Sequence, residues 1–280
     1  MCAEGVGRGF EASREIFDCH THIFPDKIAE KASAGIGGFY GIPILFDGTA
    51  GTLIRVCREN GVSGCLVCSV ATKPEQVENI NDFIGESASS SNGFFTGFCS
   101  LHPDMTEKEL DDEVARVIAM GLKGVKLHPD FQEFKADGAR AFKIYEVVGG
   151  RLPFLIHAGD SRYPYSSPKR IAGAAKRFPE MTVIAAHLGG WSEWDDAVSR
   201  LADRGNVCVD ISSSLYALRP EKAREYVAAY GEDRVLFGTD YPMWDVKEEL
   251  ERFDRLDLDE RARRKILCGN AKKLLDPADL

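Results

Sequence analysis

Several features that mark membrane-spanning, secreted or nucleic-acid-binding proteins are scarce in this chain of 280 residues. No uninterrupted apolar run approaches the roughly 18 residues that cross a bilayer, and Met1–Arg14 lacks the apolar core of a secretory signal. Acidic residues outnumber basic ones by 44 to 35. The resulting net charge of −9 argues against nucleic acid or an anionic membrane as the main partner, because phosphates bind clustered Lys and Arg. We therefore expect a soluble, cytoplasmic protein that binds a small molecule.

Features that would divide the chain into separate domains are scarce too. The chain has no low-complexity block, long charge run or Pro-rich linker, so we expect one domain over residues 1–280. The eight cysteines do not resemble a small disulfide scaffold. The Cys65-x-x-Cys68 spacing is compatible with a zinc or redox site, but the segment reads as a strand, and residues three apart on a strand face opposite sides. We therefore expect buried, reduced thiols.

The chain repeats one pattern: a short apolar, β-branched run, a polar or Gly-containing turn, and an amphipathic stretch. Eight runs are typical of strands: Glu15–Cys19, Gly64–Val70, Phe94–Leu101, Gly124–Leu127, Pro153–Ile156, Thr182–Ala186, Asn206–Ile211 and Arg234–Gly238. Helical spacing fills the gaps, most clearly in Glu107–Met120, Trp191–Leu201 and Arg219–Tyr230. Strands that alternate with helices predict an α/β fold with a parallel sheet, and eight such units are the number that closes a (β/α)₈ TIM barrel.

An open, doubly wound sheet is the main alternative fold. It usually carries a Gly-rich phosphate-binding turn after its first strand. Here the first strand ends instead in Asp18-Cys-His-Thr-His22, so the barrel is favoured. The pattern breaks between Phe24 and Asp47, which is Gly-rich and too irregular for a simple connection. We expect an inserted loop at about 24–47, either a lid over the barrel mouth or an extended surface loop.

The six histidines share one kind of position, since each lies at the C-terminal end of a predicted strand. They are His20, His22, His102, His128, His157 and His187. Chance would scatter them over helices and loops as well. Active sites of (β/α)₈ barrels lie at the C-terminal strand ends, so this placement predicts a site built from histidines. His102 and His128, each followed by Pro, have a second interpretation as caps of local backbone hydrogen bonds.

His20 and His22 have the spacing of two metal ligands. Residues two apart on a strand point to the same face, so both imidazoles can reach one cation. His157 would add a third nitrogen from across the barrel. Asp240 would add an oxygen from the end of the last strand, which closes the barrel against the first. Catalytic zinc sites commonly use three protein ligands and a water whose pKa the metal lowers, and the same donors suit manganese or iron.

The motifs around these residues resemble the amidohydrolase superfamily, and within it the amidohydrolase-related branch that includes aminocarboxymuconate-semialdehyde decarboxylase and related hydrolases. The matching segments are Asp18–Pro25 (DCHTHIFP), Gly124–Pro129 (GVKLHP), Ile156–Gly159 (IHAG), Ala186–Gly190 (AHLGG), Leu236–Pro242 (LFGTDYP) and Gly269–Leu275 (GNAKKLL). The resemblance implies one divalent metal, zinc before manganese or iron, held by His20, His22, His157 and Asp240. It also implies that His187 acts with Asp240 in catalysis; a second metal is less favoured.

Lys126 and His128 lie two apart on the fourth predicted strand and therefore share a face. We interpret Lys126 as a cationic substrate anchor or as the partner of buried Asp18. The less favoured interpretation is the carboxylated lysine that bridges two metals in binuclear members of the superfamily. His128 would contact the substrate, or bind a second metal if one exists.

Three further residues near strand ends are predicted to contact the substrate: Arg162, Trp191 and Trp244. A guanidinium matches a carboxylate through two hydrogen bonds, so Arg162 suggests a small carboxylated substrate. Our first choice of reaction is hydrolysis of an ester, lactone or amide by metal-activated water. The alternative is a metal-dependent, non-oxidative decarboxylase or hydratase that uses the same site, and the third hypothesis is a non-catalytic metal-binding barrel. A homodimer is compatible with such a barrel.

Overall fold

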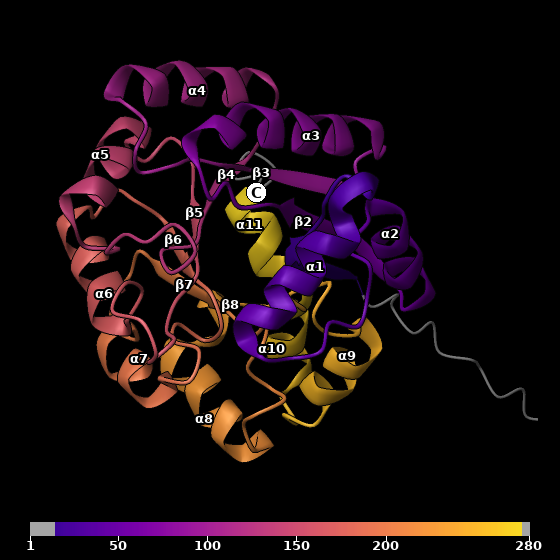
Figure 1. The fold of residues 1–280 in the computed structure, drawn as a ribbon. Coiled ribbons are helices and arrows are strands. Elements are labelled where there is room, and N and C mark those ends of the chain that lie inside the picture. The colour runs from indigo at the N-terminus through magenta and orange to yellow at the C-terminus, as the bar shows by residue number, and fades with distance from the viewer. Residues whose placement is uncertain (1–14, 276–280) are drawn as a thin grey trace, which may run out of the picture.

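A parallel barrel forms the centre of the computed structural model, which describes residues 15–275 (Figure 1). Its strands follow one another around the sheet in chain order, and neighbours pair in parallel. They are β1 (Ile16–His22), β2 (Val62–Cys68), β3 (Phe95–Ser100), β4 (Gly124–Leu127), β5 (Phe154–Ile156), β6 (Val183–Ala185), β7 (Val207–Asp210) and β8 (Val235–Leu236). Each predicted strand overlaps one of these, so the predicted (β/α)₈ barrel is confirmed. The expectation for Met1–Arg14 lies outside the described residues.

The barrel closes through the segment that follows β8. The backbone N–H of His22 donates to the carbonyl of Tyr241 at 2.7 Å. In return, the N–H of Asp240 donates to the carbonyl of His20 at 2.8 Å. The end of the last strand is therefore joined to the end of the first, and Asp240 lies beside His20 as expected.

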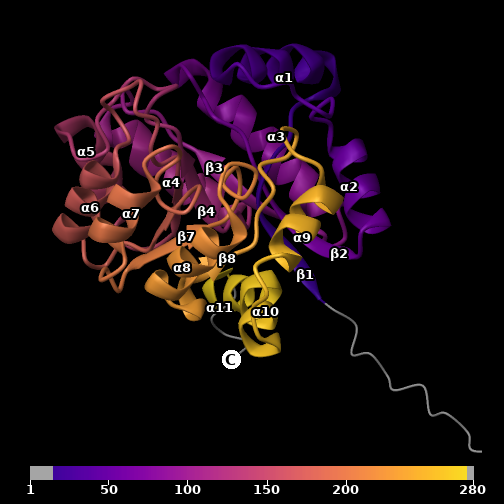
Figure 2. The same ribbon diagram turned by 90° about the horizontal axis from the view of Figure 1, so that it is seen from below.

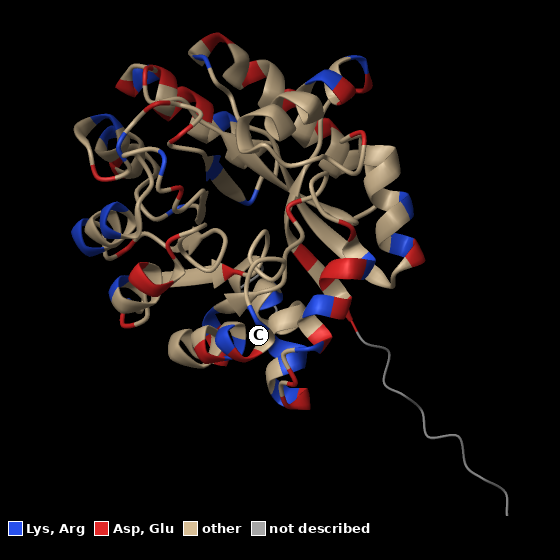
Figure 3. Cartoon of the chain, turned by 60° about the horizontal axis from the view of Figure 1, so that its bottom comes forward, with Lys and Arg blue, Asp and Glu red and all other residues tan. Residues whose placement is uncertain are grey.

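Helices surround the barrel, and most of the charged residues lie in them (Figure 3). They are α1 (Asp26–Tyr40), α2 (Ala50–Glu59), α3 (Val77–Ser90), α4 (Glu107–Ala119), α5 (Ala139–Val148), α6 (Pro168–Arg177), α7 (Trp194–Leu201), α8 (Pro220–Tyr230), α9 (Val246–Asp254), α10 (Glu260–Arg264) and α11 (Asn270–Leu275). Short 3₁₀ turns, η1 (Pro74–Gln76) and η2 (Glu232–Arg234), and a π-helical turn, η3 (Lys265–Gly269), complete the elements. The three helices predicted from spacing correspond to α4, α7 and α8. No helix in residues 15–275 is long and apolar enough to cross a membrane.

The expectation of an inserted loop at about 24–47 is corrected by the structure, because most of this segment is α1. Its first half is rich in Ala, Lys and Glu, which favour helix and offset the glycines of its second half, each unfavourable by about 1 kcal/mol relative to Ala. The helix ends at Gly41, whose φ of +66° is the left-handed conformation common after a helix. Figure 2 shows α1 at one end of the barrel and α10 and α11 at the opposite end.

Two hydrophobic clusters hold the barrel together. The larger one fills the layer between the strands and the surrounding helices. The smaller one fills the interior near α11 and consists of Cys19, Leu66, Cys68, Phe98, Leu155, Ile184, Ala186, Leu236, Ala271 and Leu275. The last two belong to α11, which therefore closes this end of the barrel (Figure 1). Cys65 and Cys68 lie in different clusters, as expected for opposite faces of a strand, and each cysteine within residues 15–275 is a free thiol.

Candidate metal centre and active site

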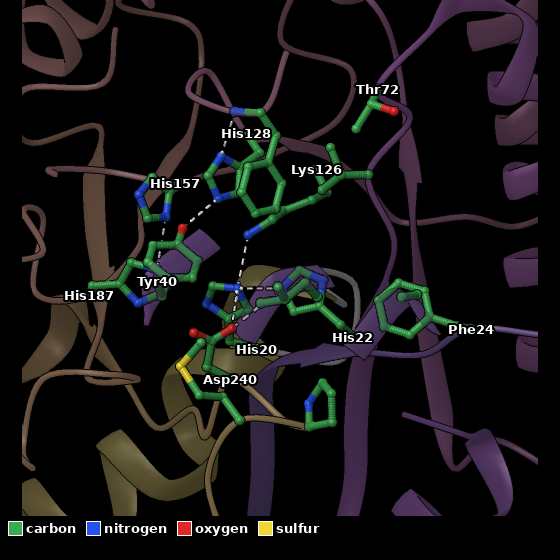
Figure 4. Close-up of a pocket in the computed structure, with 16 residues that line it drawn as sticks. His20, His22, Phe24, Tyr40, Thr72, Lys126, His128, His157, His187 and Asp240 are labelled. Carbon is green, nitrogen blue, oxygen red and sulfur yellow. Dashed lines mark hydrogen bonds and ion pairs between the residues drawn. The ribbon is translucent and has the colours of Figure 1, made fainter. Parts of the chain in front are cut away.

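A cavity of about 180 Å³ lies at the C-terminal ends of the strands, beneath α1 (Figure 4). Its charged and imidazole side chains are His20, His22, Lys126, His128, His157, His187 and Asp240. The remaining wall is mostly apolar and includes Phe24, Phe131 and Met243. Five of the six histidines thus meet at one place. The sixth, His102, accepts a hydrogen bond from the N–H of Asp104 at 3.2 Å, which is the local capping role.

Three of the predicted metal ligands converge in this cavity. The Nε2 atoms of His20 and His22 lie 3.2 Å apart, and Asp240 Oδ1 lies 3.5 Å from the first and 3.4 Å from the second. Gly238 allows the last strand to come this close, since a Cβ at that position would lie 3.0 Å from the Cβ of His20. Imidazole nitrogens with a carboxylate oxygen form a donor set that suits Zn²⁺, Mn²⁺ or Fe²⁺.

Asp210, at the end of β7, orients His20. Its Oδ2 lies 3.0 Å from His20 Nδ1, and its Oδ1 accepts the hydroxyl of Ser212. Burial raises the pKa of Asp210, but His20 and His187 outweigh this effect and hold the pKa below its usual value. The ionised carboxylate therefore accepts the Nδ1 proton, and the Nε2 lone pair of His20 faces the cavity. A carboxylate commonly fixes the tautomer of a metal-binding histidine in this way.

The converging donors attract positive charge. The buried ammonium of Lys126 lies 2.8 Å from His20 Nε2 (Figure 4). Burial lowers the pKa of His22, but Cys68 and Asp240 outweigh this effect and raise the pKa to about 9. A proton, an ammonium or a metal ion would each neutralise the carboxylate that faces the two imidazoles. The residues present therefore fit a divalent cation.

His157, the fourth predicted ligand, lies to one side of this group. His187 donates its Nδ1 proton to the carbonyl of Ser212 at 3.1 Å, because a carbonyl oxygen only accepts. The Nε2 of His187 therefore accepts from Nδ1 of His157 at 3.1 Å. Within residues 15–275, His157 Nε2 has no hydrogen-bond partner and lies 3.4 Å from Asp130 Oδ2. The structure thus pairs His157 with His187 and does not place it in the converging group of three.

Both predicted catalytic residues have an unusual backbone. The φ angle is +63° at Asp240 and +61° at His187, in the left-handed region that non-glycine residues rarely adopt. Such conformations cost on the order of 1–3 kcal/mol and persist where the surrounding structure determines them, often at active sites. Here the turn after β8 directs the Asp240 side chain toward His22 while the Asp240 N–H still bonds to His20.

Three of the predicted substrate contacts reach the cavity or its edge. Lys126 and His128 line the cavity, and Trp191 lines a narrow side pocket next to it. Lys126 does not pair with Asp18, because that carboxylate accepts instead from the N–H and hydroxyl of Thr239. The ammonium of Lys126 therefore faces the cavity and is placed to meet an anionic ligand.

Arg162 and Trp244 line neither space, contrary to the expectation that they contact the substrate. The guanidinium of Arg162 forms two hydrogen bonds with Asp160, at 2.9 and 2.7 Å, because this nearby carboxylate already offers the bidentate partner. Trp244 Nε1 donates to Ser213 Oγ at 2.8 Å, and that hydroxyl donates to Asp240 Oδ2 at 2.6 Å. Trp244 therefore supports the site from behind Asp240.

Two residues of the site were not predicted from the sequence. Asp210 carried a signal, since it is an acidic residue at the end of an apolar strand, and Asp240 likewise follows the next strand. Tyr40 carried none, because it lies in the segment expected to be a loop. The structure places its hydroxyl 2.8 Å from His128 Nε2.

The fold and the site agree with the comparisons to known proteins. The family model described as amidohydrolase matches residues 17–276, so the chain belongs to the amidohydrolase family and is an enzyme of this type. The chain is 21% identical over 253 residues to the gamma-resorcylate decarboxylase of Polaromonas sp. (strain JS666). The match covers 71% of this chain and 76% of the relative.

Two solved structures share the fold. An uncharacterised TIM-barrel protein of Bordetella bronchiseptica superposes with a TM-score of 0.78 at 20% identity, over 95% of this chain and 100% of the other. The 5-carboxyvanillate decarboxylase of Novosphingobium aromaticivorans, complexed with manganese and 4-hydroxy-3-methoxy-5-nitrobenzoic acid, superposes with a TM-score of 0.74 at 17% identity, over 95% and 97%.

These relatives correct the first choice of reaction. We expected hydrolysis of an ester, lactone or amide, whereas the curated relative is a decarboxylase, as is the manganese-containing neighbour. The alternative of non-oxidative decarboxylation therefore fits better than hydrolysis. The sequence could not separate the two reactions because the same metal-and-carboxylate apparatus serves both. A divalent metal is supported, but zinc as the first choice is not, since the metal in this neighbour is manganese.

Proposed function

We propose that this enzyme is a divalent-metal-dependent, non-oxidative decarboxylase of a hydroxylated benzoic acid. The observation that carries the proposal is the convergence of His20, His22 and Asp240 in a cavity of about 180 Å³. A cavity of roughly 150 Å³ accommodates a benzene molecule, so this space suits one substituted aromatic ring. The decarboxylase relatives act on ring-bound carboxylates of this kind, as their names state.

We further propose that His20, His22 and Asp240 hold the metal. Assignment of His157 as an additional ligand rests on the family resemblance. A bound divalent cation would orient the oxygens of the substrate and withdraw negative charge from them. Manganese is the first metal to test, because the solved neighbour contains it, and zinc and iron suit the same donors.

The reaction requires a proton at the ring carbon that bears the carboxylate. The C–C bond then breaks, carbon dioxide leaves, and the bonding electrons restore the aromatic ring. The ionised Asp240 would accept a proton from a hydroxyl of the substrate and pass it to this carbon, because Ser213 holds its Oδ2 while its Oδ1 faces the cavity. The phenolate so formed would regain a proton from water after carbon dioxide has left. His187 is neutral because burial lowers its pKa, and its position beside His157 suits orientation of the substrate. The Lys126 ammonium would attract the substrate carboxylate.

The test uses protein stripped of metal and reloaded with Mn²⁺, Zn²⁺ or Fe²⁺. Each form is incubated with gamma-resorcylate and with 5-carboxyvanillate, and both carbon dioxide and the decarboxylated phenol are quantified. We expect equal amounts of the two products from at least one substrate and none from metal-free protein. Equal activity with and without metal, or the absence of carbon dioxide from a panel of hydroxybenzoates, would contradict the proposal.

The assembly and the location of the protein remain predictions. A homodimer is compatible with the fold, and light scattering of the purified protein would test it. Imaging of the tagged protein in its cell would test the expected cytoplasmic location.

A further inference from the structure

We propose that Tyr40, at the end of α1, is a substrate-binding residue whose hydroxyl donates a hydrogen bond to an anionic oxygen of the aromatic acid. For the class of substrate, this inference rests on the proposed function. Among the α1 residues that line the cavity (Ala32, Ile36 and Tyr40), Tyr40 alone has a polar side-chain group. Its ring packs against Phe131 and, edge-on, against Trp191. The helix over the barrel mouth thus adds one hydroxyl to a site otherwise built from strand ends.

A chain of hydrogen bonds determines how this hydroxyl is oriented. The N–H of Phe131 donates to His128 Nδ1 at 3.3 Å, so this nitrogen carries no proton. A neutral imidazole then has its proton on Nε2. That nitrogen lies 2.8 Å from the Tyr40 oxygen and donates to it (Figure 4). Burial, with a contribution from Lys126, holds the pKa of His128 well below its usual value, which agrees with a neutral ring.

Because His128 is the donor in this pair, the hydroxyl hydrogen of Tyr40 is available to another acceptor. Residues 15–275 show no acceptor for it. Burial raises the pKa of Tyr40 well above its usual value, and nearby carboxylates such as Asp240 add to this effect, so the group remains a donor at neutral pH. A polar group that lines a cavity and has a free hydrogen is placed to fix the orientation of a ligand there. A carboxylate or phenolate oxygen of the substrate would satisfy it.

Arg162 holds the end of α1 in place over the cavity. Its guanidinium donates to the carbonyl of Phe39 at 3.0 Å and is itself held by Asp160. It also lies over the rings of Phe39 and Tyr40, at 5.2 and 5.6 Å from their centroids. Tyr40 is therefore fixed by its neighbour in the chain as well as by His128, and a positioned donor of this kind selects one substrate oxygen.

The variant Tyr40→Phe tests the proposal, because it removes the hydroxyl and keeps the ring. Because the manganese-loaded protein should turn gamma-resorcylate over, its binding is measured as the KM of decarboxylation. Binding of resorcinol, which has the same phenols and no carboxylate, is measured as its inhibition constant. We expect Tyr40→Phe to bind gamma-resorcylate about 10- to 100-fold more weakly, the effect of losing one hydrogen bond to a charged oxygen. The matched control is Tyr163→Phe, whose ring stacks on Phe39 outside the cavity lining and for which neither constant should change.

The two probes distinguish which oxygen Tyr40 contacts. Weaker binding of gamma-resorcylate alone assigns Tyr40 to the carboxylate, and weaker binding of both assigns it to a phenolic oxygen. The metal content of Tyr40→Phe should equal that of the wild type, because Tyr40 is not among the converging ligands. If Tyr40→Phe binds gamma-resorcylate as tightly as the wild type does, this inference is overturned and the proposed function stands. A wild-type protein that binds neither probe nor any other hydroxybenzoate overturns both.

Discussion

The barrel interior has two halves that differ in composition although the same strands build them. In the half near α11 the inward side chains are apolar, as at Leu155 and Cys208. Two residues further along the same strands, about 6–7 Å away, stand His157 and Asp210. One half therefore supplies burial of apolar surface, and the other holds charges that an apolar interior would not tolerate. Stability and chemistry are therefore separated along the strand axis.

Buried carboxyl groups show the same contrast. Burial raises the pKa of Asp240, but His20 and His22 outweigh it and hold the pKa well below its usual value. Glu249, on α9 outside the barrel, has no such neighbours, and burial raises its pKa to about 7 although Arg252 lowers it. The imidazoles of His20 and His22 thus keep Asp240 ionised, as a metal ligand must be, whereas the buried carboxyl of Glu249 keeps its proton to a higher pH.

The largest expected effect comes from Asp240→Asn in the polar half. The amide loses both the charge that binds a metal and the ability to carry a proton, so we expect kcat to fall more than about 1,000-fold, or 4 kcal/mol. Bound metal should fall as well. The measurements are carbon dioxide release and metal content per chain. The control is Asp111→Asn, whose side chain is 72% exposed. Activity near that of the wild type would contradict the assignment of Asp240.

The next effect comes from Phe98→Ala in the apolar half. Phe98 is fully buried and fills the space that Gly124 leaves, where an added Cβ would lie 2.3 Å from the ring. We expect a loss of about 3–5 kcal/mol in the free energy of unfolding, measured with urea. The kcat per folded molecule should stay close to that of the wild type at low temperature. A large loss of kcat without a loss of stability would break the separation of the two halves.

A smaller effect is expected from Asp210→Asn, which leaves the ligands in place. Without the carboxylate, His20 is no longer held in the tautomer that directs Nε2 to the cavity. Loss of such a partner typically weakens metal binding about 10- to 100-fold. Competition with a chelator would measure the change, and exposed Asp233→Asn is the control. Unchanged metal affinity would show that Asp210 acts only in packing.

The smallest effect is expected from Glu249→Gln, outside both halves. Its folded-state pKa of about 7 lies above the ordinary value of 4.5, so the folded protein holds this proton more tightly than the unfolded chain does. The resulting stabilisation is complete below pH 4.5 and is lost as pH rises through 7. We expect the variant to lose about 1 kcal/mol less stability than the wild type between pH 6 and 8. Urea unfolding at each pH measures this, with exposed Glu251→Gln as the control.

The sequence was informative where a periodic pattern decides the structure. The eight strands follow from short apolar runs, and alternation of side chains on β1 places His20 and His22 on one face. Closure of an eight-stranded barrel then brings Asp240 to them. These predictions required only the direction of side chains on a strand and the order of the strands.

The sequence was less informative where neighbours far along the chain decide. The glycines of α1 made this segment resemble a loop, so neither the helix nor the approach of Tyr40 to the cavity could be predicted. Arg162 was expected to face the substrate, but Asp160 offers a closer partner. The choice between hydrolysis and decarboxylation depends on the shape of the cavity, which loops and α1 form together, and not on the metal ligands that both reactions share.

The hydrogen bond from the Asp240 N–H to the carbonyl of His20 has a consequence for the order of events during synthesis. These two residues belong to the last and the first of the eight strand–helix units. A growing chain that has emerged only as far as α8 possesses His20 and His22 but lacks the carboxylate that completes the group. Under the proposed assignment of ligands, the enzyme acquires its metal late, when the final unit docks, and a chain that loses this docking releases the ion before the rest of the barrel unfolds.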